Sequence, residues 1–76
     1  MKELVEYIAK SLVDDPAQVT VTEVVSGPEV IIELHVAPED MGRVIGRGGR
    51  VANAIRTLMQ VCAVRDARRA QLEIVE

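Results

Sequence analysis

A glycine-rich segment near the middle of the chain connects two stretches with helical apolar spacing, and this connection constrains the fold strongly. The segment reads Ile45-Gly46-Arg47-Gly48-Gly49-Arg50. Glycine has no Cβ, so the backbone here can adopt positive φ angles and approach another molecule closely. The segment also leads into the N-terminus of the second helix, where unpaired N–H groups and the positive end of the helix dipole attract anions. The sequence therefore predicts a tight helix–helix link that could bind phosphate.

Arginine side chains within and beside this link add full positive charges. We expect Arg47 at the tip of the link to be the main phosphate contact, and Arg50 in the first turn of the second helix to be the next, because guanidinium groups fork onto phosphate oxygens. A cation at a helix N-terminus opposes the dipole, which indicates a role other than stability for Arg50. For Arg43, one turn earlier, a place in the same patch and an ordinary solvated position are both open. A plain helix–helix turn is the alternative for the whole link.

The apolar spacing around the link predicts an α-β-β-α-α-β order. Helical spacing predicts helices over residues 2–13, from residue 38 to the link, and over residues 50–65. Alternating or β-rich segments predict strands over residues 18–26, 29–37 and 70–75. The alternation breaks at residues 23–25, which predicts a β-bulge or a change of face there. The pattern suits one α+β domain over residues 1–76, with the helices on one face of a three-stranded sheet.

The composition restricts the core and the cellular setting. The chain has no Phe or Trp and one Tyr, so we expect an aliphatic core. No apolar run reaches the roughly 18 residues that a membrane span needs, and the first residues begin an amphipathic pattern, which is not typical of a signal peptide. The single Cys62 and single His35 leave no internal disulfide and no metal-ligand cluster. We expect a cytoplasmic protein without a metal or cofactor.

The charge is distributed unevenly along the chain. The net charge of −3 taken alone disfavours a nucleic acid, because binding one requires cations. Residues 1–40, however, carry two lysines and nine acids, whereas residues 41–76 carry seven arginines and three acids. Such asymmetry indicates an anionic partner for the second half of the chain, and an ordinary surface of mixed charge is the alternative.

The link and its context resemble a known family. Ile45-Gly46-Arg47-Gly48-Gly49 resembles the I-G-x-x-G signature of KH domains, which lies between two helices, and the element order is similar to the type II KH fold. The chain length and the flanking segments resemble the small bacterial KhpA-like RNA-binding proteins. The resemblance implies an RNA-binding, chaperone-type protein whose loop grips about four single-stranded nucleotides, with the bases over an aliphatic groove. The sequence does not distinguish RNA from single-stranded DNA. The residues that the resemblance and the charge pattern assign to RNA are Arg43, Ile45, Gly46, Arg47, Gly48, Gly49 and Arg50.

Enzyme activity has no support in the sequence. The G-x-G-x-x-G dinucleotide pattern would require glycine at Val51, and the P-loop pattern lacks its Lys-Ser/Thr ending. Both motifs also follow a strand, whereas this link follows a helix. The serines have no base near them in the pattern, so nucleophilic catalysis is not indicated.

The helix over residues 50–65 has more apolar surface than one packed face requires. The stripe Val51, Ile55, Leu58 and Cys62 is expected to face the core. The residues flanking this stripe include a candidate dimer face at Ala54, Met59 and Val61. Either the N-terminal helix covers the excess or a second chain does. The family resemblance implies a homodimer and a larger KH-containing partner of the Jag (KhpB-like) type. A protein–protein adaptor that uses this helix is therefore the alternative function.

Overall fold

The computed structural model describes residues 1–75, and within them helices and strands follow the predicted order. Helix α1 spans Lys2–Leu12, α2 spans Met41–Ile45 and α3 spans Arg50–Arg65. The strands are β1 at Thr20–Ser26, β2 at Glu29–His35 and β3 at Arg69–Val75. Short 3₁₀ helices cover Pro16–Gln18, Pro38–Asp40 and Arg47–Gly49. The expected α+β order α-β-β-α-α-β is confirmed.

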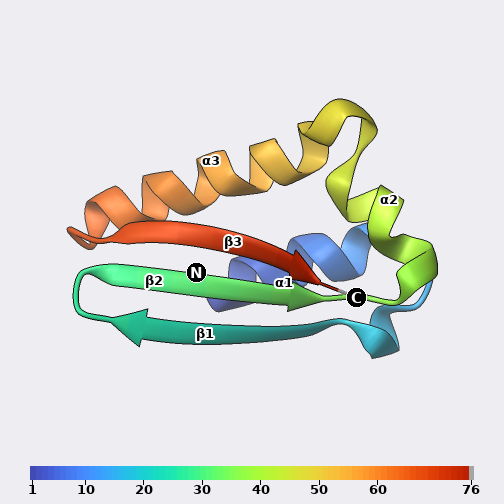
Figure 1. Cartoon of the computed structure of the whole chain (residues 1–76), viewed down its shortest axis with the longest axis horizontal. Coiled ribbons are helices and arrows are strands. Elements are labelled where there is room, and N and C mark those ends of the chain that lie inside the picture. The colour runs from blue at the N-terminus through green and yellow to red at the C-terminus, as the bar shows by residue number, and fades with distance from the viewer. Residues whose placement is uncertain (76) are drawn as a thin grey trace.

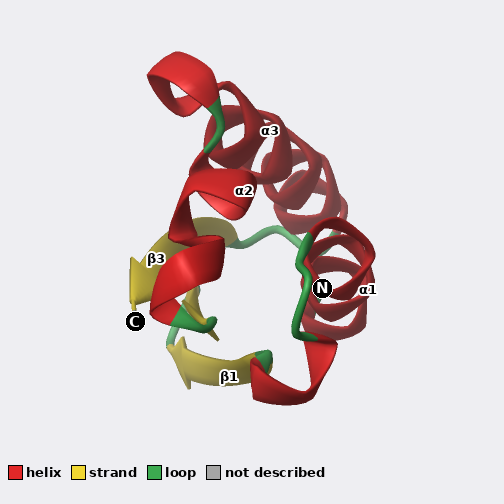
Figure 2. Ribbon diagram, turned by 90° about the vertical axis from the view of Figure 1, so that its right-hand side faces the viewer, coloured by secondary structure: helices red, strands yellow, loops and turns green. Residues whose placement is uncertain are grey.

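The three strands form one sheet in the order β1-β2-β3 (Figure 1). Strands β1 and β2 form an antiparallel hairpin around a tight turn, in which Gly27 adopts a φ of 58°. Strand β3 pairs in parallel with β2, because α2 and α3 carry the chain back to the starting end of β2. All three helices lie on one side of this sheet, as expected (Figure 2).

The expected bulge in β1 is absent. The register from Thr20 opposite His35 to Ser26 opposite Glu29 is uninterrupted. Val24 and Val25 break the sequence alternation for another reason: both are about half exposed, at the hairpin end of β1. At this end a strand position needs no strict alternation, because neither side chain is fully buried.

The core is aliphatic, as the composition predicts. Its largest fully buried side chains are Ile32, Leu34, Met59, Val5 and Val44. They come from β2 and from each of the three helices, so one cluster joins the sheet to the helical layer. The alternating burial along β2 follows the predicted pattern.

Helix α3 is rotated relative to the expected buried stripe. Only Ile55 of the expected set is fully buried, whereas Leu58 remains 46% exposed. The residues that α3 turns into the core are Ala52, Ile55, Met59 and Ala63. Two of these four are alanines, whose small side chains allow the helix backbone to approach the sheet closely. The rotation is smaller than the angle of about 100° between consecutive helical residues, and it moves Met59 from the expected flank into the core.

Candidate nucleic-acid interface

The glycine link forms an exposed loop between α2 and α3, at the end of the molecule opposite the β1–β2 hairpin turn (Figure 1). Helix α2 ends where Gly46 adopts φ 77° and ψ 169°, and its N–H donates to the Gly42 carbonyl at 2.9 Å. Gly48 and Gly49 also have positive φ values, of 64° and 80°. The positive φ values let the chain turn sharply from α2 into α3 within residues 46–49.

Two glycines of the loop are required for different reasons. A Cβ on Gly46 would lie 2.6 Å from the Val51 side chain and 2.8 Å from its backbone nitrogen, so even alanine would displace the start of α3. A Cβ on Gly48 would meet nothing within 4 Å, so there the positive φ is the constraint. The open space around Gly48 leaves the backbone accessible to another molecule.

The loop presents N–H groups and two guanidinium groups to solvent. Among the described residues, the N–H groups of Arg47 and Gly48 have no backbone acceptor. The side chains of Arg47 and Arg50 are exposed, and neither forms an ion pair within residues 1–75. Donors, free cations and the N-terminus of a 16-residue helix therefore meet at one surface. This arrangement is suited to binding a phosphate-bearing chain.

The other two residues predicted to bind RNA near the loop, Ile45 and Arg43, lie in different environments. Ile45 is 36% exposed at the end of α2 and can offer apolar surface beside the loop. Arg43 does not join Arg47 and Arg50 in a free patch: its Nη2 lies 2.8 Å from Asp14 Oδ2, and its Nε lies 3.3 Å from Asp40 Oδ1. The described residues enclose no pocket.

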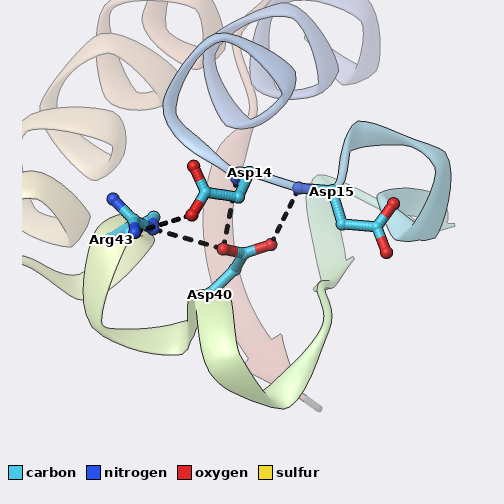
Figure 3. A network of polar contacts seen from close by, with 4 residues as sticks. All are labelled: Asp14, Asp15, Asp40 and Arg43. Carbon is cyan, nitrogen blue, oxygen red and sulfur yellow. Dashed lines mark hydrogen bonds and ion pairs between the residues drawn. The ribbon is translucent and has the colours of Figure 1, made fainter.

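Asp40 has a position that its sequence context did not predict. Residues 38–40 begin a helical segment, as expected: they form a 3₁₀ helix that leads into α2, and Asp40 precedes α2. In addition, the Asp40 carboxylate is buried, forms no cap hydrogen bond to α2 and points toward the segment after α1 (Figure 3). Its partners lie 25 and 26 residues earlier, and no local pattern in the sequence indicates such a contact.

The three residues predicted to form a dimer face differ in exposure. Ala54 is exposed and Val61 is 57% exposed on α3, whereas Met59 is buried with 1% exposure. Met59 therefore belongs to the core, and its assignment to a dimer face was wrong. Exposed apolar side chains at Leu58 and Val64 extend the surface around Val61. We call the surface formed by Ala54, Leu58, Val61 and Val64 the α3 apolar face.

No described helix has both the length and the apolar character required to cross a membrane. Within residues 1–75 no group of three or more His, Cys, Asp or Glu side chains is arranged to hold a metal ion. The one cysteine, Cys62, is a free thiol and half-buried on α3.

Comparison with known proteins identifies the family of this loop and fold. The family model described as "KhpA/KhpB, KH domain" matches residues 2–74. The chain belongs to the KhpA/KhpB KH-domain family. The match extends over α2, the glycine loop and α3, in agreement with the resemblance of residues 45–49 to the KH signature.

Proteins from several bacteria match this chain over nearly its whole length. A protein from Clostridium acetobutylicum is 55% identical over 75 residues, covering 99% of this chain and 100% of the relative. One from Clostridium perfringens is 53% identical with the same coverage. One from Aquifex aeolicus is 43% identical over 76 residues, covering 100% of this chain and 96% of the relative. Each of the three relatives is named RNA-binding protein KhpA. No solved structure has significant similarity to the chain.

Proposed function

We propose that this chain is a non-enzymatic, single-stranded RNA-binding domain that holds the sugar–phosphate backbone with residues 46–50. The observation that carries the proposal is the exposed glycine loop with two unpaired guanidinium groups at the N-terminus of α3. The name of the relatives, RNA-binding protein KhpA, supports RNA as the ligand. In the mechanism we propose, the free N–H groups and the arginines contact phosphate oxygens, while the small glycines let the ribose approach.

The distribution of acidic residues explains how a chain of net charge −3 can bind a polyanion. The side chains of Glu29 and Glu33 on β2 point away from the helices, because the intervening Val30, Ile32 and Leu34 are buried against them. Glu73 of β3 lies beside Glu33 in the register. Glu29 also pairs with Arg69 at 3.6 Å, so this bare sheet face carries three carboxylates and one arginine. RNA is therefore expected to bind at the glycine loop, where Arg47 and Arg50 form no ion pair within residues 1–75.

Salt dependence gives the direct test of this mechanism. If the loop neutralises about two to four phosphates, the logarithm of the association constant should fall against the logarithm of salt concentration with a slope of about −1.5 to −3. The measurement is a fluorescence polarisation titration with a labelled single-stranded RNA at several salt concentrations. A DNA strand of the same sequence and an RNA duplex are the controls. An affinity that does not change with salt would contradict phosphate binding by the loop.

A second candidate function is protein association through the α3 apolar face. Exposure of Leu58, Val61 and Val64 favours it, because contiguous apolar helix surface is commonly covered by another chain. We propose a homodimer through this face, and pairing with a larger Jag-type (KhpB-like) protein is the related possibility that the joint KhpA/KhpB family model supports. The proposed location is the cytoplasm, where Cys62 would remain a reduced thiol.

Changing Val61 to aspartate tests the association. Because Val61 is 57% exposed, we expect V61D to fold normally and to dissociate the dimer to single chains in size-exclusion chromatography with light scattering. The matched control is Val24→Asp, which introduces the same charge at a half-exposed valine of the bare sheet face and should leave the dimer intact. A wild-type chain that stays monomeric at high concentration would refute both the dimer and an adaptor role that depends on self-association.

A further inference from the structure

Asp40 is the one buried polar or charged residue among those the structure describes, with 2% exposure. Burying a carboxylate carries a large desolvation cost unless hydrogen bonds and a counter-charge compensate for it. Both oxygens of Asp40 are used: Oδ1 accepts the N–H of Asp14 and Oδ2 accepts the N–H of Asp15, each at 3.2 Å. Arg43 supplies the counter-charge through Nε at 3.3 Å from Oδ1.

Arg43 also joins the two sides of this contact. Its Nη2 lies 2.8 Å from Asp14 Oδ2, so one guanidinium spans the carboxylates of Asp14 and Asp40 (Figure 3). These four residues, Asp14, Asp15, Asp40 and Arg43, form what we call the Asp40 network. It connects the segment that follows α1 to the segment that begins α2, and thus joins parts of the chain that are far apart in sequence.

The position of the network matters because a helix as short as α2 is not stable alone and takes its orientation from its contacts with the rest of the domain. Five residues make a helix about 7.5 Å long, far below the roughly 12 residues at which an isolated helix becomes even marginally stable. Asp40 immediately precedes α2 and Gly46 immediately follows it. Val44 is the only fully buried residue of α2, and Met41 packs partly buried against the core. The Asp40 network adds a polar anchor at the start of this short helix. A change in the tilt of α2 would therefore move the loop.

We infer that Asp40, with Arg43 as its counter-ion, is a positioning residue that holds α2 and the glycine loop in the orientation that accepts RNA. The claim that this orientation favours RNA binding rests on the proposed function. The claim that Asp40 holds the orientation of the loop does not. If loss of the network reduces the population of the accepting orientation to about one tenth, the apparent affinity falls about tenfold, because only that fraction binds. The loop would still contact the same number of phosphates.

The isosteric change Asp40→Asn separates positioning from simple electrostatics. The amide has one acceptor oxygen, so one of the two backbone N–H groups loses its partner, and Arg43 loses part of its counter-charge. The change also removes a negative charge near a phosphate-binding surface. Coulomb attraction alone would therefore tighten RNA binding, whereas loss of positioning weakens it.

The experiment compares Asp40→Asn with a variant that is destabilised elsewhere. The matched control is Val30→Ala, which removes buried volume at the hairpin end of β2, away from the loop. Amide hydrogen exchange is followed by NMR, with the N–H groups of Gly46 and Gly49 as probes of the loop, since they donate to Gly42 and Gly46. RNA affinity is measured on the same samples by polarisation, well below the melting temperature of each variant.

The expected result for Asp40→Asn is faster exchange at the two glycines than at sheet amides, with about tenfold weaker RNA binding and an unchanged salt slope. Val30→Ala should raise amide exchange rates without favouring the two loop glycines over the sheet amides, and its affinity for RNA should equal that of the wild type. Loop exchange and affinity equal to those of Val30→Ala, or tighter binding, would overturn the inference.

A second variant covers the case in which Asp40→Asn does not fold. Arg43→Met keeps the apolar stem of a half-exposed side chain and removes only the ion pairs. Faster exchange confined to the loop would support the network, and wild-type exchange there would overturn it. The exchange readout also separates the two proposals: if neither wild type nor variant binds RNA, the proposed function fails, while the exchange pattern still decides the role of Asp40.

Discussion

Replacing Arg47 and Arg50 together with aspartate is expected to abolish single-stranded RNA binding while the fold remains intact. Both side chains are exposed and unpaired within residues 1–75, so their loss breaks no internal contact. Aspartate at the first position of α3 even matches the helix dipole. Each charge-assisted hydrogen bond contributes about 1.5–3 kcal/mol, so losing two of them weakens binding by at least about 100-fold. Repulsion from the new carboxylates adds to this loss.

The measurement is a polarisation titration with single-stranded RNA, together with circular dichroism melting to show that the variant folds. The charge-matched control is Arg65→Asp with Arg68→Asp, which makes the same change in net charge at the opposite end of α3. Arg65 lies about 22 Å from Arg50 along the helix, well beyond the screening length of about 8 Å at physiological salt, so the control should bind almost normally. Equal losses in the two double variants would mean that net charge, and not the loop, determines binding.

Changing Met59 to aspartate is expected to unfold the domain, because the side chain is buried in the core. An uncompensated buried charge costs about 3–5 kcal/mol, and a chain of this size has a total stability near the lower end of about 5–15 kcal/mol. The prediction differs from the one that the sequence alone supports, in which Met59 lies on a dimer face and its replacement breaks only an assembly.

Urea unfolding followed by circular dichroism measures this effect. Met59→Leu conserves volume and should lower the free energy of unfolding by less than about 1.5 kcal/mol. V61D, only two residues away but exposed, should leave the unfolding midpoint of the single chain almost unchanged. A folded, monomeric Met59→Asp protein would return Met59 to the interface and contradict the core assignment.

Local patterns predicted the elements of this fold well. Alternation over residues 29–37 placed Val30, Ile32 and Leu34 on the buried face, and the structure agrees. Helix α3 begins at Arg50 and ends at Arg65, as expected. These predictions succeed because helical and strand periodicity are properties of neighbouring residues. Proline ends elements through its fixed φ and missing N–H, and glycine through its access to positive φ.

The errors share a different cause. The apolar arc of α3 is wide enough to allow several rotations, and packing against the rest of the domain selected the one that buries Ala52, Met59 and Ala63. The break in alternation at Val24 and Val25 came from exposure at the hairpin end of β1 and not from a bulge. In each case the outcome depended on which surfaces other elements cover.

The sequence by itself determined the order of helices and strands, the KH-type signature, and the glycines and arginines of the loop, because these follow from spacing and residue chemistry. The tertiary structure alone decided which face of α3 is buried, that Arg43 is held in ion pairs with Asp14 and Asp40, and that the Asp40 carboxylate joins segments more than 20 residues apart. Such contacts form between segments distant in the chain, and local periodicity carries no information about which of them will meet.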